Sequence, residues 1–387
     1  MNMFTALRAS RASAAALASV GVMWGAFAGL VPDIKDRVGA SDAELGAALL
    51  ASALGGVIAM WAAPWTGQRL GRFTLPVLGL VICISVLLPM FPTGVVGLGV
   101  VLFAMGISVA TLDISANVHI SGLEARHGLH LMNVNHAMFS FAFAGAAWGA
   151  GLGRKAGLGP EHILPFMSLA CLVLTFAMRV PQVADAPEAD AIDAPRRPPW
   201  GAIVLTGLIL FSAFIGENAT EAWSALHIER TLGAEPGHGS FGPATLGLVM
   251  AFGRLSGQLL TAKLGDARLI FYSALLGMLG ALTIAAAQSV PVALAGVAVT
   301  GLGMAVIVPS VTSILGARVT ERQRAHAISR SWMVGMVGFF IGPSMMGGIA
   351  ELFGLRLSFV AVALIISMIL PAIWALAWRP ARLAGQP

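Results

Sequence analysis

The chain alternates between long apolar runs and short segments that hold most of its charged residues. An apolar run of roughly 20 residues forms a helix long enough to cross the hydrocarbon core of a bilayer. Runs of this kind in the first half are 12–32, 45–68, 73–112, 127–153 and 162–178. The run 73–112 is long enough for two crossings. We expect it to break at Pro89 and Pro92, because proline disrupts helices.

The second half repeats this pattern after a polar interval. Residues 181–200 are rich in proline and charge, which predicts a linker. The apolar runs then resume at 201–224, 243–262, 269–317, 331–350 and 357–378, and the longest of them should break near Pro291. The sequence therefore predicts an all-α polytopic membrane protein with twelve transmembrane helices. It divides into an N-terminal six-helix bundle (1–180), a cytoplasmic linker (181–200) and a C-terminal six-helix bundle (201–387).

Composition excludes the water-soluble classes of protein. Charged residues make up 11% of the chain, against about 25% in soluble domains, and the mean hydropathy is +0.85. A soluble enzyme, a disordered chain or a secreted disulfide scaffold does not have this composition. The net charge of +5 does not indicate nucleic-acid binding either, because no cluster of Lys and Arg alternates with stacking aromatic residues. We expect no nucleic-acid partner.

The distribution of Lys and Arg predicts the orientation, because cytoplasmic loops are enriched in these residues. With the N-terminus in the cytoplasm, most of the basic residues fall on the cytoplasmic side. The opposite side receives only a minority: Lys35, Arg37, Arg154, Lys155, Arg230 and Arg356. Both termini and the linker are thus expected in the cytoplasm. The protein is expected to be a multi-pass protein of the inner membrane and a monomer.

The two halves of the chain repeat each other weakly. The segment 44–56 in the second run aligns with 245–257 in the eighth, and the Gly-Leu pair at 157–158 after the fifth run matches 354–355 after the eleventh. Parallel repeats of this kind are typical of secondary transporters. Small residues allow close helix contacts in membranes, and the candidates here are Gly46, Gly55, Gly56, Gly342, Gly347 and Gly348.

Ionisable and amide residues inside the runs are candidates for function, because a charge at the centre of a bilayer costs about 3 kcal/mol or more. In the fourth run, Asp113 and Asn117 lie one turn apart on one helix face. In the fifth run, Asn133 and His136 share a face. Two interpretations stay open: a proton and substrate site in a central cavity, or a polar contact that only holds two helices together.

A second set of candidates lies on the seventh and eighth runs. Glu217 and Glu221 are one turn apart and repel each other when both are ionised, which suits a site that takes up and releases a proton. Arg254 lies at a similar depth, so that an ion pair with Glu217 is expected, either as a permanent bridge or as a switch. Additional candidates are Asn218, Trp24 and Trp332 for substrate binding and Arg330 for an inner gate.

At these residues the chain resembles the major facilitator superfamily over nearly its full length, and most of all its fucose-permease-like sugar:proton symporters and their putative-permease relatives. Asp113 with Asn117 is similar to an acidic residue followed by Ala-Asn in the fourth helix of that group. Asn133 is similar to the Asn that opens its fifth helix. Gly253-Arg254-Leu-Ser-Gly257 is similar to its Gly-Arg-x-x-Gly.

The chain also departs from the family pattern at two positions. Gln68 stands where the cytoplasmic loop signature has Asp, and Pro32 stands where the sugar symporters have an Asp in the first helix. The resemblance implies that Asp113 couples protons to substrate and that Asn133 lines the cavity.

The predicted function is secondary active transport of a small polar solute, a sugar or a similar metabolite, across the inner membrane. Transport is expected to proceed by alternating access and proton-coupled symport. Asp113, Glu217 and Glu221 are the predicted proton-coupling residues. Asn117, Asn133, His136 and Asn218 are the predicted hydrogen-bonding groups. No ATP-binding, zinc-protease or serine-hydrolase motif occurs, so we expect no enzyme, no cofactor and no metal. The alternative is a proton-driven exporter of a small amphipathic compound.

Overall fold

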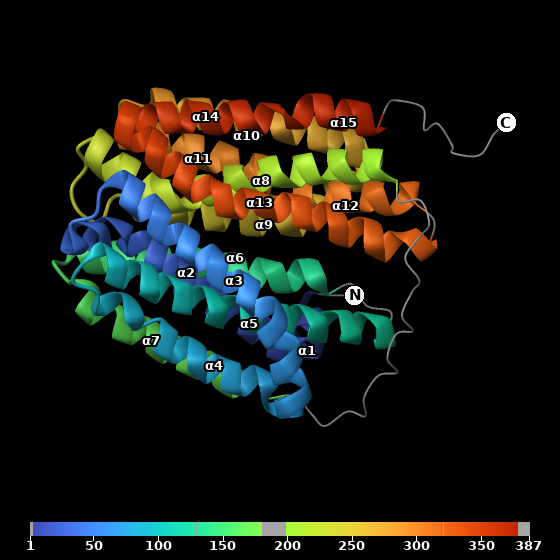
Figure 1. Ribbon diagram of the computed structural model, residues 1–387, viewed down its shortest axis with the longest axis horizontal. Coiled ribbons are helices and arrows are strands. Elements are labelled where there is room, and N and C mark those ends of the chain that lie inside the picture. Colours follow the sequence, from blue (N-terminus) through green and yellow to red (C-terminus); the bar gives the residue numbers. More distant parts are fainter. Residues whose placement is uncertain (1–2, 128–130, 180–198, 320, 378–387) are drawn as a thin grey trace.

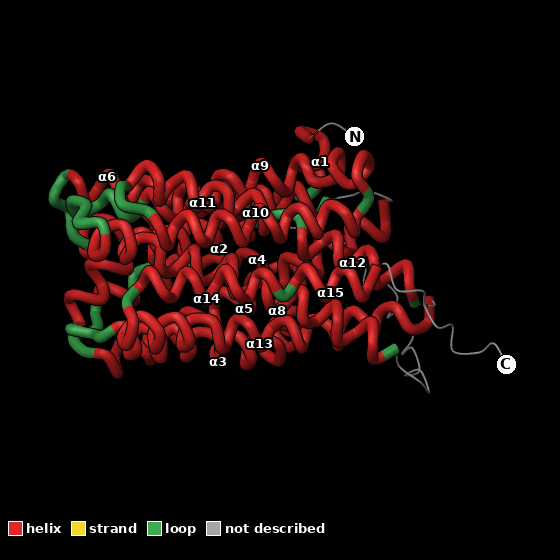
Figure 2. The backbone as a smooth tube through the Cα atoms, turned by 90° about the horizontal axis from the view of Figure 1, so that it is seen from above, coloured by secondary structure: helices red, strands yellow, loops and turns green. Residues whose placement is uncertain are grey.

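The computed structural model describes residues 3–127, 131–179, 199–319 and 321–377, and within these ranges every regular element is a helix. Figure 1 shows the N-terminal half, blue to green, packed beside the C-terminal half, yellow to red. Seen from above, the helices lie along the long axis and most loops lie at its two ends (Figure 2). Almost all of the predicted linker 181–200 lies outside the described residues.

The first half contains seven α-helices. α1 (Met3–Ala9) is short, and α2 (Arg11–Val38), α3 (Asp42–Leu70) and α5 (Val95–His127) are long. α4 (Thr74–Ser85) follows the 3-10 turn Gly71–Phe73 and is extended by another at Leu88–Met90. The half ends with α6 (Met132–Lys155) and α7 (Pro160–Ala177). The expected break at the proline pair is present between α4 and α5.

The second half contains eight α-helices and one π-helical segment. α8 (Trp200–Leu226) continues into the π-helix His227–Thr231, followed by α9 (Phe241–Leu264) and α10 (Asp266–Ala286). The remaining helices are α11 (Val290–Met304), α12 (Ile307–Arg318), α13 (Glu321–Phe353), α14 (Leu355–Ser367) and α15 (Ile369–Ala377). Two breaks were not predicted, between α11 and α12 and between α14 and α15. Each break precedes a proline, Pro309 as the third residue of α12 and Pro371 as the third residue of α15. A proline nitrogen cannot donate the backbone hydrogen bond that would continue the preceding helix across the break.

Nine described stretches are long and apolar enough to cross a membrane. They are Arg11–Val38, Asp42–Met90, Val95–Glu124, Pro160–Ala177, Trp200–Thr231, Asp266–Ala286, Val290–Arg318, His326–Phe353 and Leu355–Ala377. Asp42–Met90 contains both α3 and α4. α6 and α9 are not in this set; they carry the intramembrane residues His136 and Arg254, and they pack against each other between the two halves.

The two halves meet mainly through two pairs of helices, α3 with α13 and α6 with α9, and α2 also contacts α8 and α9. The repeat in the sequence relates α3 to α9 and α6 to α13, so the two contacts are equivalent under that repeat. The contact between α3 and α13 is close where glycines lie. A Cβ added to Gly347 would come within 2.4 Å of the Asp42 carbonyl oxygen, and one added to Gly46 within 2.7 Å of the Pro343 carbonyl oxygen.

The other glycines expected at helix contacts behave differently. A Cβ on Gly55 would lie 2.2 Å from the Phe103 carbonyl oxygen, which places α3 tightly against α5. Gly56 and Gly342 have only ordinary neighbours, at 3.9 and 3.5 Å. Gly348 has no described atom within 4 Å of the position of a Cβ, so the prediction was wrong there. Gly348 lies next to the crowded Gly347 but points away from the neighbouring helix.

The start of α3 is fixed by local hydrogen bonds. The Ser41 hydroxyl accepts from the backbone N–H of Glu44 at 3.2 Å, and the Glu44 carboxylate accepts from the N–H of Ser41 at 2.8 Å. Gly39 ends α2 with φ of +65°, a conformation that glycine adopts without strain. This short turn between α2 and α3 places several charged side chains at one end of the molecule. We call the end containing Gly39–Ser41 and Gly233–Ser240 the clamp end, and the opposite end, where α1 and the end of α15 lie (Figure 1), the termini end.

Gly347→Val should destabilise the protein, because the added carbons overlap the backbone of α3 and overpacking costs about 1–3 kcal/mol. The measurement is the melting temperature of the detergent-purified protein. Gly348→Val is the matched control and should melt within a degree or so of the wild type. Equal melting temperatures for both variants would contradict the packing described here.

Candidate functional site

A small cavity lies between the two halves near the middle of the molecule. Its volume is about 10 Å³, the room of about one water molecule. α6, α8 and α9 line it, with four polar residues and five others: Ser140, Glu217, Glu221 and Arg254, then Phe139, Phe143, Leu246, Gly247 and Met250. Three of the residues singled out in the sequence therefore face one internal space.

Arg254 joins the halves at this cavity. Its Nη2 donates to Oε1 of Glu217 on α8 at 2.9 Å, and its Nη1 donates to Oγ of Ser140 on α6 at 2.5 Å. Both side chains of the ion pair are less than a fifth exposed. The ion pair expected from the depths of Glu217 and Arg254 is present, and the bond to Ser140 adds a link to the first half.

Glu221 lies one turn after Glu217 and faces the same cavity. Among the described residues, its carboxylate has no hydrogen-bond or ion-pair partner. Arg254 is already bonded to two other groups, and Glu217 carries the same charge as Glu221. The cavity therefore holds one carboxylate more than it holds cations.

A second polar group lies in the first half, between α5 and α6. The Asn117 amide donates to Oδ2 of Asp113 at 3.3 Å and to the Asp113 carbonyl oxygen at 2.9 Å. The Asn117 Oδ1 lies 3.1 Å from Nε2 of His136. Ser140, which contacts Arg254, donates to the His136 carbonyl oxygen at 3.2 Å. The chain from Asp113 through Asn117 to His136 thus ends one helical turn from the central cavity.

The structure separates the remaining predicted residues from the cavity. Asn133 and Asn218 are half-buried and do not line it. Trp24 packs edge-on against Phe27 in the first half, and Trp332 packs against Phe214 in the second. Arg330 lies over the ring of Trp200 at 5.1 Å, toward the termini end, and its Nη1 is buried without a hydrogen bond in the described part of the chain.

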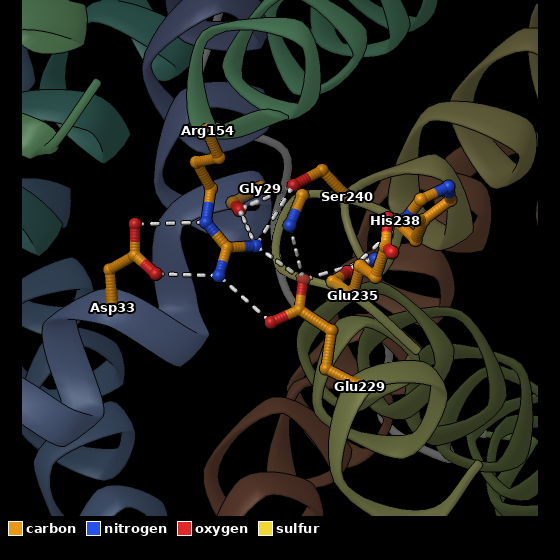
Figure 3. Close-up of polar contacts among 9 residues, drawn as sticks. Gly29, Asp33, Arg154, Glu229, Glu235, His238 and Ser240 are labelled. Atoms are coloured by element: carbon orange, nitrogen blue, oxygen red, sulfur yellow. Dashed lines mark hydrogen bonds and ion pairs between the residues drawn. The ribbon is translucent and has the colours of Figure 1, made fainter. Parts of the chain in front are cut away.

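The most extensive charged group lies at the clamp end (Figure 3). The guanidinium of Arg154, on α6, binds Asp33 of α2 through Nε and Nη2, at 2.8 and 2.5 Å. It also binds Glu229, in the π-helix after α8, through Nη1 and Nη2, at 2.5 and 2.8 Å. The Arg154 side chain is only 2% exposed. One buried cation is thus shared by a carboxylate from each half.

The loop after the π-helix holds Glu229 in place. Its Oε1 accepts from the backbone N–H groups of Gly237 and Gly239 at 3.0 and 3.1 Å. Ser240 donates to the carbonyl oxygen of Gly29 on α2 at 2.7 Å, which adds another bond between the halves. π-helical turns often occur at functional sites; here the turn carries Glu229 and Arg230 side by side.

Arg230 takes part in a second cluster at the clamp end. It pairs with Asp42 at the start of α3, and Asp42 also pairs with Lys35 of α2 at 3.2 Å. From α13, the Glu351 carboxylate accepts from the backbone N–H of Asp42 at 2.9 Å and from that of Ala43 at 3.4 Å. The second half therefore caps a helix of the first half.

The analysis of charge along the sequence did not identify these clusters as functional. Arg154, Lys35 and Arg230 lie at the ends of apolar runs and were used only to assign the sides of the membrane. One signal was available: Asp33 stands directly after Pro32, at the position compared with the acidic residue of the sugar symporters. Finding its partner required the fold, because Arg154 lies 121 residues away.

The described residues contain no group of three or more His, Cys, Asp or Glu side chains placed to hold a metal ion. The polar groups of the centre and of the clamp end instead bind one another between helices.

Sequence comparison matches residues 13–290 and 208–387 to the Major Facilitator Superfamily. The chain belongs to this superfamily. It is therefore a multi-pass membrane transporter and not an enzyme. It is 25% identical to an uncharacterized transporter of this superfamily from Yersinia pestis, over 89% of this chain and 90% of that protein. It is 27% identical to the membrane protein MosC of Rhizobium meliloti, over 90% of this chain and 86% of that protein.

Two solved structures share the fold. One is a bacterial homologue of the human lysosomal transporter Spinster in an inward-facing, occupied conformation, with a TM-score of 0.73, 16% identity and coverage of 95% of this chain and 96% of that one. The other is the nucleoside transporter NupG, with a TM-score of 0.72, 13% identity and coverage of 98% and 100%. The identities are low, so these structures establish the architecture only.

Arg154→Gln should lower the melting temperature of the purified protein strongly. It leaves two carboxylates without a cation, and breaking a buried pair costs about 3–5 kcal/mol. Arg37→Gln is the control, since Arg37 forms an exposed pair with Glu161 within the first half, and exposed pairs contribute about 0–1 kcal/mol. If Arg154→Gln melts no lower than Arg37→Gln, the pairs of Arg154 with Asp33 and Glu229, which we call the clamp together with the pair of Arg230 and Asp42, do not stabilise this conformation.

Proposed function

We propose that the protein is a proton-coupled symporter that moves a small polar solute across the inner membrane by alternating access. One observation carries this proposal: a cavity between the halves holds an ion pair that bonds to both of them, beside a carboxylate that has no partner among the described residues. A site that contacts both bundles is where a bound solute can change how they fit together. Charged groups at such a depth are costly and are retained for function.

The contacts at the clamp end indicate which side of the protein is closed. Arg154 with Glu229, Asp42 with Arg230 and Glu351 with the start of α3 all join the halves at the clamp end. Under the orientation predicted from Lys and Arg, this is the outer side. We therefore propose that the structure is closed to the outside, and that solute leaves or enters the central cavity from the cytoplasm.

Outward opening requires these inter-bundle bonds to break, and the arrangement keeps the cost of breaking them low. When Glu229 leaves, Arg154 still has Asp33 of its own half. When Arg230 leaves, Asp42 still has Lys35 of its own half. Glu229 and Arg230 are adjacent and of opposite charge. Separation of these two pairs therefore leaves Arg154 with Asp33 and Asp42 with Lys35 on one half, and Glu229 with the oppositely charged Arg230 on the other.

Asp113, Glu217 and Glu221 are the proposed proton-coupling groups. Asp113 has an amide as its described side-chain partner and Glu221 has none, so neither carboxylate is neutralised by a described cation. Asn117, Asn133, His136 and Asn218 are the proposed hydrogen-bonding groups for solute once the cavity opens. Asn133 and Asn218 lie outside the present cavity, so their role requires a wider conformation.

The full topology is part of the proposal. Twelve crossings result when α6 and α9 cross as well and when Asp42–Met90 holds two crossings. We propose bundles of residues 1–180 and 201–387, joined by a cytoplasmic linker, with both termini in the cytoplasm and a monomeric protein. Arg330, near the termini end, is the proposed inner-gate residue. The resemblance to sugar:proton symporters supports symport as the mode of coupling.

Export of a small amphipathic compound is the second candidate. Phe139, Phe143, Leu246 and Met250 occupy much of the cavity wall, and an apolar wall fits an amphipathic solute better than a sugar. The fold and the clamp serve import and export alike. The direction of solute movement in proteoliposomes with an imposed proton gradient separates the two.

Asp113→Asn and Glu217→Gln should each abolish solute-driven proton movement, because neither amide can take up a proton. The measurement is the pH change outside proteoliposomes when a transported solute is added. Glu44→Gln is the control: Glu44 is exposed, and Gln also fits its role in the helix cap. Normal proton-coupled uptake in both central variants would overturn the assignment.

Glu229→Gln should open the clamp more often, since one carboxylate of the Arg154 pair is lost while Asp33 stays. Ser240→Cys, buried at the clamp, reports this when Cys83 and Cys171 are replaced by alanine. A membrane-impermeant maleimide added outside intact spheroplasts should label this thiol several-fold faster in Glu229→Gln. Glu161→Gln should leave the rate unchanged. Labelling only from the cytoplasmic side would reverse the proposed orientation.

A further inference from the structure

We propose that the transported solute is an organic cation, a small compound with a protonated amine attached to an apolar body, and that Glu221 is its counter-ion. This inference rests on the proposed transport function and names the class of solute for the central cavity. Charge, lining and the bonds of Arg254 carry it.

The charges around the cavity do not balance. Glu217 and Glu221 contribute two carboxylates, and Arg254 contributes one guanidinium. Arg254 donates to Glu217 and to Ser140, and no bond from it to Glu221 is formed among the described residues. One carboxylate is left over, and Glu221 is the one without a described partner. A solute with a single positive charge makes the cavity neutral.

The apolar wall fits the rest of such a solute. Phe139 and Phe143 stack with their ring centroids 6.1 Å apart and their planes at 24°, and both face the cavity with Leu246 and Met250. Aromatic faces attract ammonium groups, most strongly where water is excluded. A cavity lined by a carboxylate and two aromatic rings therefore offers an amine a counter-ion and apolar surface.

The other classes of solute fit less well. An anion would meet two carboxylates and a single guanidinium, so the negative groups outnumber the positive one. A neutral sugar needs a hydrogen-bonding partner for each hydroxyl that it buries, and Ser140 is the one neutral hydrogen-bonding side chain in the cavity lining. Asp113 lies on α5, outside the lining, and remains available for the proton. A carboxylate cannot hold a proton and serve as the counter-ion of an amine at once. Glu221 therefore exchanges its proton for the amine, while Asp113 carries the proton that is coupled to transport.

The small size of the cavity means that the solute binds in a more open conformation than the one described. At about 10 Å³ the cavity is too small for an organic molecule in the described conformation. The amine enters when α6 and α9 move apart. Arg254 would then lose its bond to Ser140 of the first half. It would keep its bond to Glu217, because Arg254 and Glu217 both lie in the second half. Glu221 stays unmatched throughout, which is why it is the residue assigned to the amine.

The test uses the full-length protein in detergent and two sets of probes, each with one carbon skeleton. The first set is 2-phenylethylamine, 2-phenylethanol and phenylacetate; the second, which lacks an apolar body, is glucosamine, glucose and gluconate. At millimolar concentration, 2-phenylethylamine should raise the melting temperature while its alcohol and acid counterparts do not, and glucosamine should do so less. The proposal is overturned if 2-phenylethylamine has no effect, if its alcohol or acid counterpart acts equally, or if glucosamine alone stabilises the protein.

Variants then locate the site. Glu221→Gln should weaken amine binding by roughly 10- to 100-fold, as expected for loss of a charge-assisted hydrogen bond. Glu44→Gln should bind as the wild type does. Unchanged affinity in Glu221→Gln would remove this residue from the proposal, even if amines bind.

Uptake in proteoliposomes separates the inference from the proposed function. Glu221-dependent binding of an amine without any uptake would contradict transport at this site but support the choice of solute class. Proton-coupled uptake of the sugar or the acid, with no uptake of either amine, would support transport and contradict the solute class.

Discussion

An unpaired charge is costly away from water, and this constraint organises both polar regions of the protein. At the clamp end, Arg154 meets the constraint by binding two carboxylates, one from each half. At the centre, Arg254 binds Glu217 and Ser140, again across the halves. The two arginines hold together the same interface, and each keeps a partner in its own half. The interface is therefore stable when closed and does not lose all its charge pairing when it opens.

α8 connects the two regions physically. It carries Glu217 and Glu221 at the cavity, and its π-helical extension carries Glu229 and Arg230 at the clamp. Eight residues separate Glu221 from Glu229, about 12 Å at the rise of an α-helix. A rigid shift of α8 that accompanies a change at the cavity therefore acts on both clamp bonds at once. A change at the central charges can therefore be transmitted through α8 to the clamp end, which must open.

Much of the fold follows from the sequence because hydrophobic run length and proline position directly constrain helices in a membrane. The ranges of α3, α7 and α9 agree with the predicted runs to within a few residues. The break between α11 and α12 was missed because no polar residue marks it and because Pro309, the third residue of α12, was not considered as a cause; its nitrogen cannot donate a hydrogen bond back across the break. The Glu217–Arg254 pair was accessible from the depth of each residue in its run, and the Asp113–Asn117 contact from spacing on a single helix.

The clamp was not accessible in this way. Its residues lie near the ends of the apolar runs, where a charge carries no penalty and so gives no signal. Which of several such charges meet depends on how two bundles dock, and that depends on backbone approach at Gly46 and Gly347. Ser140 was missed as a partner of Arg254 for the same reason. A serine within an apolar run can hydrogen-bond to a carbonyl oxygen of its own helix as readily as to a neighbouring helix.

The bond from Glu351 to the start of α3 has a consequence for how much the sequence at the clamp can vary. The carboxylate binds the backbone N–H groups of residues 42 and 43, not their side chains. Position 43 is thus free to accept any residue that can begin a helix, and the link survives the change. By contrast, the partners of Arg154 are side chains at fixed positions. The clamp end therefore combines a contact that tolerates substitution, from Glu351 to the backbone of α3, with a contact that does not, from Arg154 to its two carboxylates.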